Sequence, residues 1–435
     1  MTSETFLSQL AIQIDGQPLS AAMASSIEQI LVETSLHLPG VATLTLHDPT
    51  LGFLDNAALE PGKAMKITGN GGAIIFDGEI IEVEAELSTE GHRVIIRAFD
   101  RLHRLARGAH TRAFTQVSDA DIVKTCASEA GLTAKSDSTP GQHAHFIQAN
   151  ETDLAMLQRR AAANGYLLYT EGQDLCFKKP SATTTINLAL NETLSVFRPR
   201  LSAIGYVGKT SVRGWDPKQK QAVIGESQNS SIPPQIGLSA KNYLNITPTG
   251  RMSDIAIQNQ DQAKQVAQAL TDAQISRFIE AEGICLGDPK IKAGVKVTIS
   301  GVGTRFSGTY LITSATHRLV ANEPYITEFS ISGLNASSLI GMLVPPPAEV
   351  QAALGGLTIG IVTDNKDPDH LGRVKLKFPL LLDEKSSQEM VTDWVRIASP
   401  SAGNNRGMLF MPEVNDEVVV GFGQGNINTP FVLGV

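Results

Sequence analysis

Short polar side chains surround a proline in the run DNKDPDH near the end of the chain. Asp364, Asn365, Asp367 and Asp369 can either give oxygen ligands to a calcium ion or bond to their own backbone in a tight turn. A calcium loop of the usual kind also needs a closing bidentate glutamate, which this spacing lacks. We therefore interpret the run as a structural loop. Gly372 at its end would let the chain turn and continue as a strand.

A second acidic cluster consists of Glu413, Asp416 and Glu417. Two carboxylates hydrolyse a glycosidic bond when they flank a substrate cleft and one of them has a raised pKa. Nothing in the sequence supplies such a cleft, and the strand EVVVGF follows directly. We interpret the cluster as a turn in which Asn415 adopts the left-handed conformation that asparagine tolerates.

Other chemical motifs are weak. His143 and His145 lie in a polar stretch that we expect to be a surface loop, without the further ligands of a zinc site. His317 lies in the predicted strand TSATHRL. There is no G-x-S-x-G elbow, and the glycine-rich 301–308 joins strands, which does not suit a phosphate cradle. We predict no catalytic residue, no metal site and no cofactor.

The composition is that of an ordinary globular protein. The chain has 435 residues, 42% of them hydrophobic and 18% charged, which is enough for two to four domains. Its net charge of −8 disfavours a specific nucleic-acid partner. Cys126, Cys176 and Cys285 are scattered and are expected to be reduced thiols. With no signal peptide and no membrane span in the pattern, we expect synthesis in the cytoplasm.

Alternation of apolar and polar residues predicts a first β-barrel over residues 1–110. Stretches such as LAIQIDG, ATLTLHD and HRVIIRAFDR have the period of two that strands show. Gly71-Gly72 and Asp77-Gly78 are predicted tight turns. Many short strands with glycine-rich turns are typical of a closed barrel.

An α+β insertion is predicted over residues 111–184. One helix begins after Ser118 and stops at Gly131, and another begins near Thr152 and ends at Asn164-Gly165.

A second hub β-barrel with a helix at roughly 259–276 is predicted over residues 185–340. Residues 193–216 resemble a strand pair, and 217–250 a long polar loop. A proline-stiffened linker is predicted at 341–356.

Residues 357–435 are predicted to form a five-stranded OB-fold barrel. We expect Trp394 and Phe422 to fill its interior, because barrel interiors need such volume. The fold class is therefore mainly β, with two hub β-barrels, an α+β insertion and a C-terminal OB domain.

The ordered motifs of this last module resemble a known family. DNKDPDHLGRVK, W-x-R, G-x-x-F-x-P-E-x-x-D-E-V, G-F and P-x-V-L-G resemble the OB domain of VgrG proteins and phage baseplate spike proteins. Residues 151–172 and 301–333 resemble, more loosely, the hub part of the same family. The resemblance gives a structural role in the OB module to Asp364, Asn365, Asp367, Pro368, Gly372, Arg373, Trp394, Pro412, Glu413, Asp416, Glu417, Gly421, Phe422, Pro430 and Gly434.

This resemblance implies a spike base of a contractile injection system. In that family, three chains supply six similar barrels that seat on a sixfold tube, with the OB domains below and a β-helical needle following. The sequence ends at Val435 without a needle, which would belong to another chain or lie beyond this residue. The implied partners are two further copies, a hexameric inner tube protein, other baseplate proteins, a PAAR-type tip or needle, and effector cargo. The particle would be a virion, a cell-anchored machine or a released one.

Residues 27–36 and 42–48 are our candidates for strand edges that face the tube, because exposed edges are docking templates. Two other functions stay open. A tail-associated cell-wall hydrolase would need a catalytic domain after the OB module. An OB-type polymer-binding module is disfavoured by the acidic balance and by the lack of interleaved aromatic and basic residues.

Overall fold

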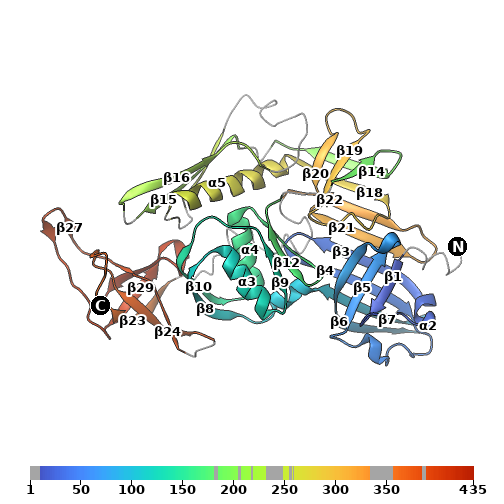
Figure 1. The fold of residues 1–435 in the computed structure, drawn as a ribbon, viewed down its shortest axis with the longest axis horizontal. Coiled ribbons are helices and arrows are strands. Elements are labelled where there is room, and N and C mark those ends of the chain that lie inside the picture. Colours follow the sequence, from blue (N-terminus) through green and yellow to red (C-terminus); the bar gives the residue numbers. More distant parts are fainter. Residues whose placement is uncertain are drawn as a thin grey trace.

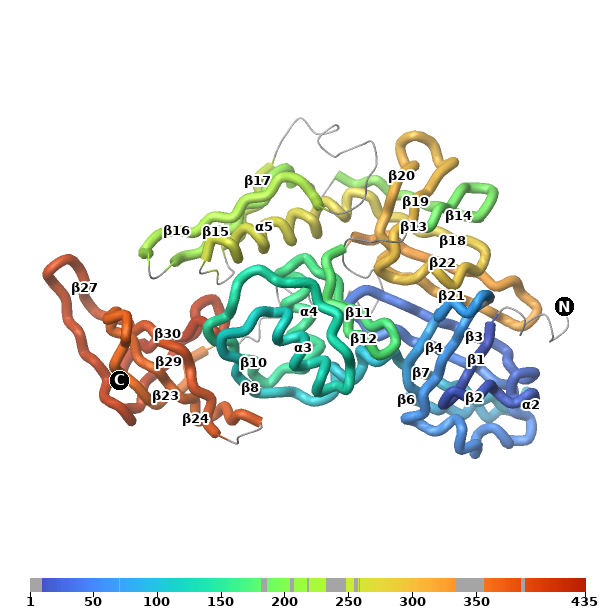
Figure 2. The backbone as a smooth tube through the Cα atoms, in the orientation of Figure 1, coloured from blue at the N-terminus to red at the C-terminus, as the bar shows by residue number. Residues whose placement is uncertain are grey.

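The protein is elongated, and its parts follow one another along the long axis (Figure 1). A computed structural model describes residues 10–180, 185–203, 207–216, 219–231, 248–253, 257, 259–333, 356–384 and 388–435. The N-terminal strands lie at one end, the C-terminal module lies at the other, and a mixed helix–strand unit lies between them (Figure 2). Nearly all of the predicted linker at 341–356 falls outside the described residues. No helix in these ranges is long and apolar enough to cross a membrane.

An eleven-stranded sheet connects the N-terminal and middle parts, in the order β14-β18-β22-β21-β3-β4-β7-β6-β5-β1-β2. Side chains alternate across a strand, so Leu10, Ile12 and Ile14 of β1 are buried while the residues between them are exposed. The N-terminal part gives β1 (Leu10–Ile14), β2 (Gln17–Pro18), β3 (Ile27–Ser35), β4 (Leu38–His47), β5 (Ala64–Gly69), β6 (Ile74–Ser88) and β7 (Gly91–Asp100). Short helical turns are α2 (Ala21–Ser25), η1 (Ala57–Leu59), η2 (Asn70–Gly72) and η3 (Arg101–Ala106).

The predicted turn at Asp77-Gly78 is wrong, because β6 continues through both residues. Gly78 faces the neighbouring strand so closely that a Cβ there would lie 2.2 Å from the carbonyl oxygen of Phe99. Glycine is needed here for close backbone approach and not for a turn. The other predicted turn is confirmed, since Gly71 and Gly72 both have positive φ.

The middle part contributes four strands to the large sheet: β14 (Leu194–Leu201), β18 (Ile279–Leu286), β21 (Ser314–Val320) and β22 (Ile326–Ile331). A smaller sheet, β13-β19-β20, packs over the same core and consists of β13 (Thr185–Ala189), β19 (Lys296–Ser300) and β20 (Gly308–Leu311). Each part has its own apolar cluster, and Leu319 and Tyr325 of the middle part join the cluster of the N-terminal part. The 301–308 segment joins β19 to β20, as predicted.

The two parts meet at the antiparallel pair β3–β21, where Val32 lies opposite His317. From β3 the sheet continues through β4, β7 and β6, and from β21 through β22, β18 and β14. Three strands on each side thus follow the central pair in a similar order, and β5, β1 and β2 extend the N-terminal side further. The prediction that 27–36 and 42–48 form free edges is wrong, because β3 and β4 are both paired on two sides.

The predicted insertion contains both expected helices, α3 (Asp119–Glu129) and α4 (Asp153–Asn164). Ser118 and Asp121 form a capping box at the start of α3, Thr152 caps α4, and Gly165 ends it with φ 67. The accompanying strands are β8 (His110–Val117), β9 (Thr133–Ser136), β10 (His143–Glu151), β11 (Leu167–Glu171) and β12 (Asp174–Lys178).

A small sheet packs on the long helix α5 (Gln260–Ile275), which confirms the helix predicted at 259–276. Its strands are β15 (Lys209–Asp216), β16 (Gln221–Ser227) and β17 (Thr249–Met252), and η5 (Ser276–Phe278) extends the helix. Two predictions are wrong here. Residues 193–216 are not a strand pair, because β14 and β15 lie in different sheets. Residues 221–227 form a strand and not a loop, whereas 232–247 fall outside the described residues.

The C-terminal module is an OB-type barrel in the strand order β25-β24-β23-β29-β30-β26. Its strands are β23 (Leu357–Asp364), β24 (Lys375–Leu382), β25 (Glu389–Val391), β26 (Arg396–Ile397), β29 (Glu417–Phe422) and β30 (Pro430–Gly434), with η6 (Gly423–Gly425) before the last. A projecting hairpin adds β27 (Ala402–Gly403) and β28 (Arg406–Gly407) (Figure 1). The mainly β class with a C-terminal OB domain is confirmed.

Candidate functional site

Asp367 organises the loop between β23 and β24. Its buried carboxylate accepts hydrogen bonds from Arg373 Nε and Nη2 at 2.9 and 2.7 Å, and from the backbone N–H groups of Asp369 and Leu371 at 3.0 and 2.9 Å. Gly372, with φ 70, then turns the chain into β24. The Arg373 guanidinium holds the pKa of Asp367 well below its usual range.

The neighbouring Asp364 makes a weaker contact, accepting one bond from the Lys366 N–H at 2.9 Å. We expect Asp367→Ala to lower the free energy of unfolding by about 2–4 kcal/mol, because the backbone N–H groups of Asp369 and Leu371 lose their acceptor and Arg373 keeps only its contact with Asp369. Asp364→Ala is the matched control and should cost about 0.5–1 kcal/mol. Denaturant unfolding of both variants measures the difference, and equal losses would contradict the central role of Asp367.

The second acidic cluster lies beside this loop. Asn365 Nδ2 donates to the carbonyl oxygen of Pro412 at 3.0 Å, and the Glu413 N–H donates to Asp416 Oδ2 at 2.8 Å. Asn415 has φ 78, which confirms the predicted left-handed turn. The sequence separates the two clusters by some forty residues, and the pairing of β23 with β29 brings them together.

The two aromatic residues of the module differ in position. Phe422 packs against the core, with its ring centroid 6.0 Å from that of Phe378. The prediction that Trp394 fills the interior is wrong, because Val395 points inward and alternation turns Trp394 outward. The indole is partly exposed, with Lys375 Nζ 5.1 Å from its ring centroid.

The remaining motif residues lie on strands or at their ends. Pro412 is buried before the turn, and Glu417 is the exposed first residue of β29. Pro430 and Gly434 bound β30. Gly421 lies between two outward leucines, where a Cβ would lie 3.0 Å from Leu433 and 3.6 Å from Leu357.

An apolar patch covers the outer face of the OB sheet. It consists of Leu357, Ile359, Val419 and Leu433, whose exposed fractions lie between 40% and 68%. Ile359 and Val419 are directly opposite each other on β23 and β29, so the patch is continuous. Adjacent exposed apolar side chains of this kind mark an interaction surface. We call these four residues the outer OB patch.

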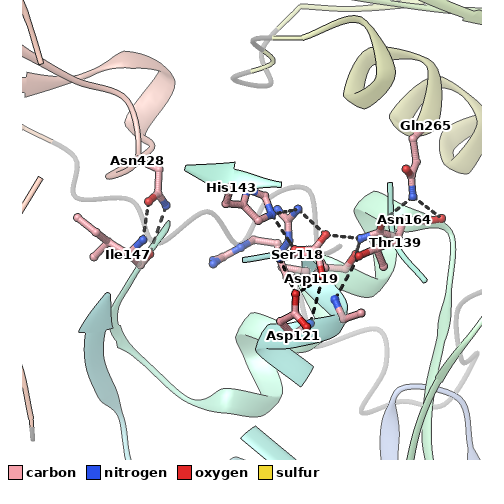
Figure 3. Close-up of polar contacts among 12 residues, drawn as sticks. Ser118, Asp119, Asp121, Thr139, His143, Ile147, Asn164, Gln265 and Asn428 are labelled. Atoms are coloured by element: carbon pink, nitrogen blue, oxygen red, sulfur yellow. Dashed lines mark hydrogen bonds and ion pairs between the residues drawn. The ribbon is translucent and has the colours of Figure 1, made fainter. Parts of the chain in front are cut away.

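A buried polar cluster around Asp119 joins four elements (Figure 3). Arg160 Nε and Nη2 donate to the Asp119 carboxylate at 2.7 and 2.8 Å, and Asn164 Nδ2 donates at 2.7 Å. His143 Nε2 lies 2.9 Å from Asp119 Oδ1. Gln265 of α5 donates to Asn164 Oδ1 and thereby connects the insertion to the middle part. Sequence reasoning missed this cluster because its members are far apart along the chain.

The prediction that His143 and His145 lie in a surface loop is wrong, since both lie on β10. Burial lowers the pKa of His145, and that of His317 to about 4. His317 is a paired sheet residue, as predicted, 2.8 Å from the Tyr325 hydroxyl. Within the described ranges, no group of three or more His, Cys, Asp or Glu is arranged to hold a metal ion.

A second polar joint connects the insertion to the OB module. Asn428 Oδ1 accepts from the Ile147 N–H at 2.6 Å, and its Nδ2 donates to the Ile147 carbonyl at 3.2 Å (Figure 3). His110 Nδ1 lies 2.7 Å from Glu384 Oε2. Ile147 and Ala149 also belong to the apolar core of the OB module. The module is therefore packed on the insertion and not merely tethered by its linker.

Two family models match the chain. The model described as the Alg8 N-terminal domain matches residues 4–321, and the type VI secretion system/phage-baseplate injector OB domain matches residues 358–435.

Among curated proteins, the type VI secretion system spike protein VgrG3 of Vibrio cholerae is 25% identical over 400 residues, covering 83% of this chain and 38% of that protein. The spike protein VgrG1a of Pseudomonas aeruginosa is 27% identical over 135 residues, covering 29% of this chain and 21% of that protein. The chain thus spans well under half the length of these curated relatives.

Solved structures share the fold. The E. coli c3393 protein, a component of the type VI secretion system, superposes with a TM-score of 0.62 at 13% identity, covering 98% of this chain and 99% of that one. A chain of the Francisella PdpA–VgrG complex superposes with a TM-score of 0.58 at 8% identity, covering 98% of this chain and 71% of that one. The 43 kDa tail protein of a Shewanella oneidensis prophage superposes with a TM-score of 0.59 at 13% identity, covering 75% of this chain and 98% of that one.

Proposed function

Since this chain belongs to the VgrG and phage-baseplate hub-spike family, and over residues 4–321 to the family described as the Alg8 N-terminal domain, we propose that it is the base of a puncturing spike. Three copies form a hub that joins a sixfold inner tube to a threefold point. The role is mechanical, and no catalytic step is assigned to the chain.

The observation that carries this proposal is the symmetry of the large sheet about the β3–β21 pair. The first four strands on the N-terminal side, β3-β4-β7-β6, correspond to the four on the other side, β21-β22-β18-β14, and β5, β1 and β2 continue the N-terminal side. A chain with two similar half-barrels gives a trimer six similar faces, and a hexameric tube end can then bind each face through nearly equivalent contacts.

The position of the OB module supports the second half of the proposal. It lies at the opposite end of the long axis from the N-terminal strands, where a spike would leave the hub (Figure 1). Its outer OB patch gives three modules an apolar surface on which to associate around one axis. The Asn428 joint would transmit axial force from the hub to the spike.

The partners and location follow from this role. The hub binds two further copies of itself, the inner tube hexamer, other baseplate proteins, and a spike tip or β-helical needle, with effector cargo attached to the spike. The protein is then part of a contractile particle, which is a virion, a cell-anchored secretion machine or a released particle.

Mass in solution tests the proposal. We expect light scattering behind size-exclusion chromatography to give the mass of three chains at micromolar concentration, because obligate trimers bury large apolar interfaces. The trimer should also cap one end of tubes assembled from a hexameric tube protein of the same system. A single-chain mass at all concentrations, or a trimer that leaves tube ends uncapped, would contradict it.

A further inference from the structure

A groove of about 1110 Å³ separates the OB barrel from the β15–β16 hairpin of the middle part. One wall is strand β15 around Trp215, and the other is formed by the OB loops after β23 and before β30. Gln424 Nε2 bridges the walls by donating to the Ser253 carbonyl oxygen at 2.7 Å. The Asn428 joint lies beside the groove and fixes the OB module against the insertion.

The groove gathers unusual aromatic surface. The chain has two tryptophans, and both line this one groove. Trp215 is 50% exposed, although nothing in its strand requires a large apolar side chain to face solvent. Phe431 adds a third ring, with the Arg396 guanidinium 5.5 Å from its centroid. Flat, solvent-facing rings in a concave site are stacking platforms for a ligand.

The charges of the groove argue against a polyanion. Its lining holds four arginines or lysines and three aspartates, so its net charge is close to balance. One of these cations, Arg373, is already bound to Asp367 and Asp369. Proteins that bind nucleic-acid phosphates need many more positive than negative side chains at the site, and this lining has no such excess.

The same charges also argue against a partner protein as the occupant of the groove. Interface cores are depleted of charged residues, because each charge must be desolvated. The outer OB patch already offers an apolar surface for protein association. A ligand rich in hydroxyl groups, by contrast, can hydrogen-bond to the arginine, aspartate, asparagine and glutamine side chains here without losing its own hydrogen bonds.

Two of the loops that line the groove also take part in polymer binding by OB folds. The loop between the first and second strands contributes Leu371 and Arg373, and the loop before the last strand contributes Gln424 and Thr429. These two loops are the ones through which OB folds bind oligonucleotides and oligosaccharides. We propose that the groove binds an uncharged oligosaccharide, with pyranose rings stacked on Trp215 and Trp394. This inference does not depend on the role as a tube adapter.

Intrinsic fluorescence of the full chain tests the proposal, because both tryptophans report from the groove. We expect a saturable emission change with a β-1,4-linked N-acetylglucosamine hexamer or with cellohexaose. Binding should change less than about twofold when NaCl is raised tenfold, since few charges are involved. No change with either sugar would overturn the proposal, and so would binding of oligo-dT or of an acidic peptide in their place. Emission that shifts with protein concentration alone would show that a second copy fills the groove.

Calorimetry of variants locates the binding. Trp215→Ala and Trp394→Ala should each raise Kd about tenfold, because each removes one stacking platform. Phe410→Ala is the matched control: it removes an exposed aromatic ring that does not line the groove, and Kd should stay unchanged. Trp215 is half exposed, so its variant will fold even if Trp394→Ala does not. Unchanged affinity in Trp215→Ala would refute the assignment.

Discussion

Leu433→Glu is expected to convert a three-chain particle into single chains. Leu433 lies in the outer OB patch, next to Leu357 across Gly421. If three modules associate through this patch, the substitution places three carboxylates in one apolar interface. Burying each costs about 2–3 kcal/mol or more, so association would weaken by roughly four to six orders of magnitude. Light scattering at micromolar concentration measures the change in mass.

Leu87→Glu is the matched control. Leu87 is also an exposed leucine, at 57% against 49% for Leu433, but it lies near the tip of the β6–β7 hairpin in the N-terminal part. Its variant should keep the three-chain mass, and both variants should keep the circular dichroism spectrum of the parent. If Leu433→Glu still has the mass of three chains, the outer OB patch is not part of the trimer interface, although the trimer itself is real.

Asp119→Ala is expected to destabilise the hub by about 3–5 kcal/mol, because it leaves the buried Arg160 guanidinium without its bidentate partner. Asn164 would also lose an acceptor and with it part of the link to Gln265 of α5. Denaturant unfolding followed by tryptophan emission measures the loss, since Trp215 lies in the sheet that packs on α5.

Asp121→Ala separates this effect from helix capping. Asp121 belongs to the same first turn of α3, but its side chain is half-exposed, with Lys124 Nζ 3.3 Å from its carboxylate. Removing its half of the capping box should cost about 1 kcal/mol. Equal losses in the two variants would show that the Asp119 cluster adds nothing beyond an ordinary helix start.

Lowering the pH should reproduce this loss of folding stability in the unsubstituted protein. Burial by itself would raise the pKa of Asp119, but Arg160 and His143 overcome it and hold that pKa well below its usual range. Because the folded-state pKa is depressed, the carboxylate stabilises the fold fully above its unfolded pKa of about 4 and loses this contribution as pH falls below that value. The acid dependence should be shallower in Asp119→Ala.

The contacts between the parts of the chain fit a protein that must transmit force along its long axis. The Asp119 cluster connects the insertion to α5, and the Asn428 and Glu384 contacts connect the insertion to the OB module. Force applied at the hub would therefore reach the OB module through these hydrogen bonds and the shared apolar core. In the proposed role this rigidity keeps the spike aligned with the tube.

Local chemistry in the sequence was enough to predict several features. Ser118, Thr152 and Gly165 mark helix ends because capping and left-handed φ depend on neighbouring residues alone. The OB module could be predicted from its ordered motifs, and Asn415 from the tolerance of asparagine for positive φ.

Tertiary structure decided everything that depends on which strands pair. The pairing of β3 with β21 made interior strands of segments expected to be edges, and the inward turn of Val395 sent Trp394 into a groove. The Asp119 cluster draws its members from three elements of the insertion and from α5. Such contacts lie outside the reach of local patterns, because periodicity reports which face of an element is apolar and does not report what that face will meet.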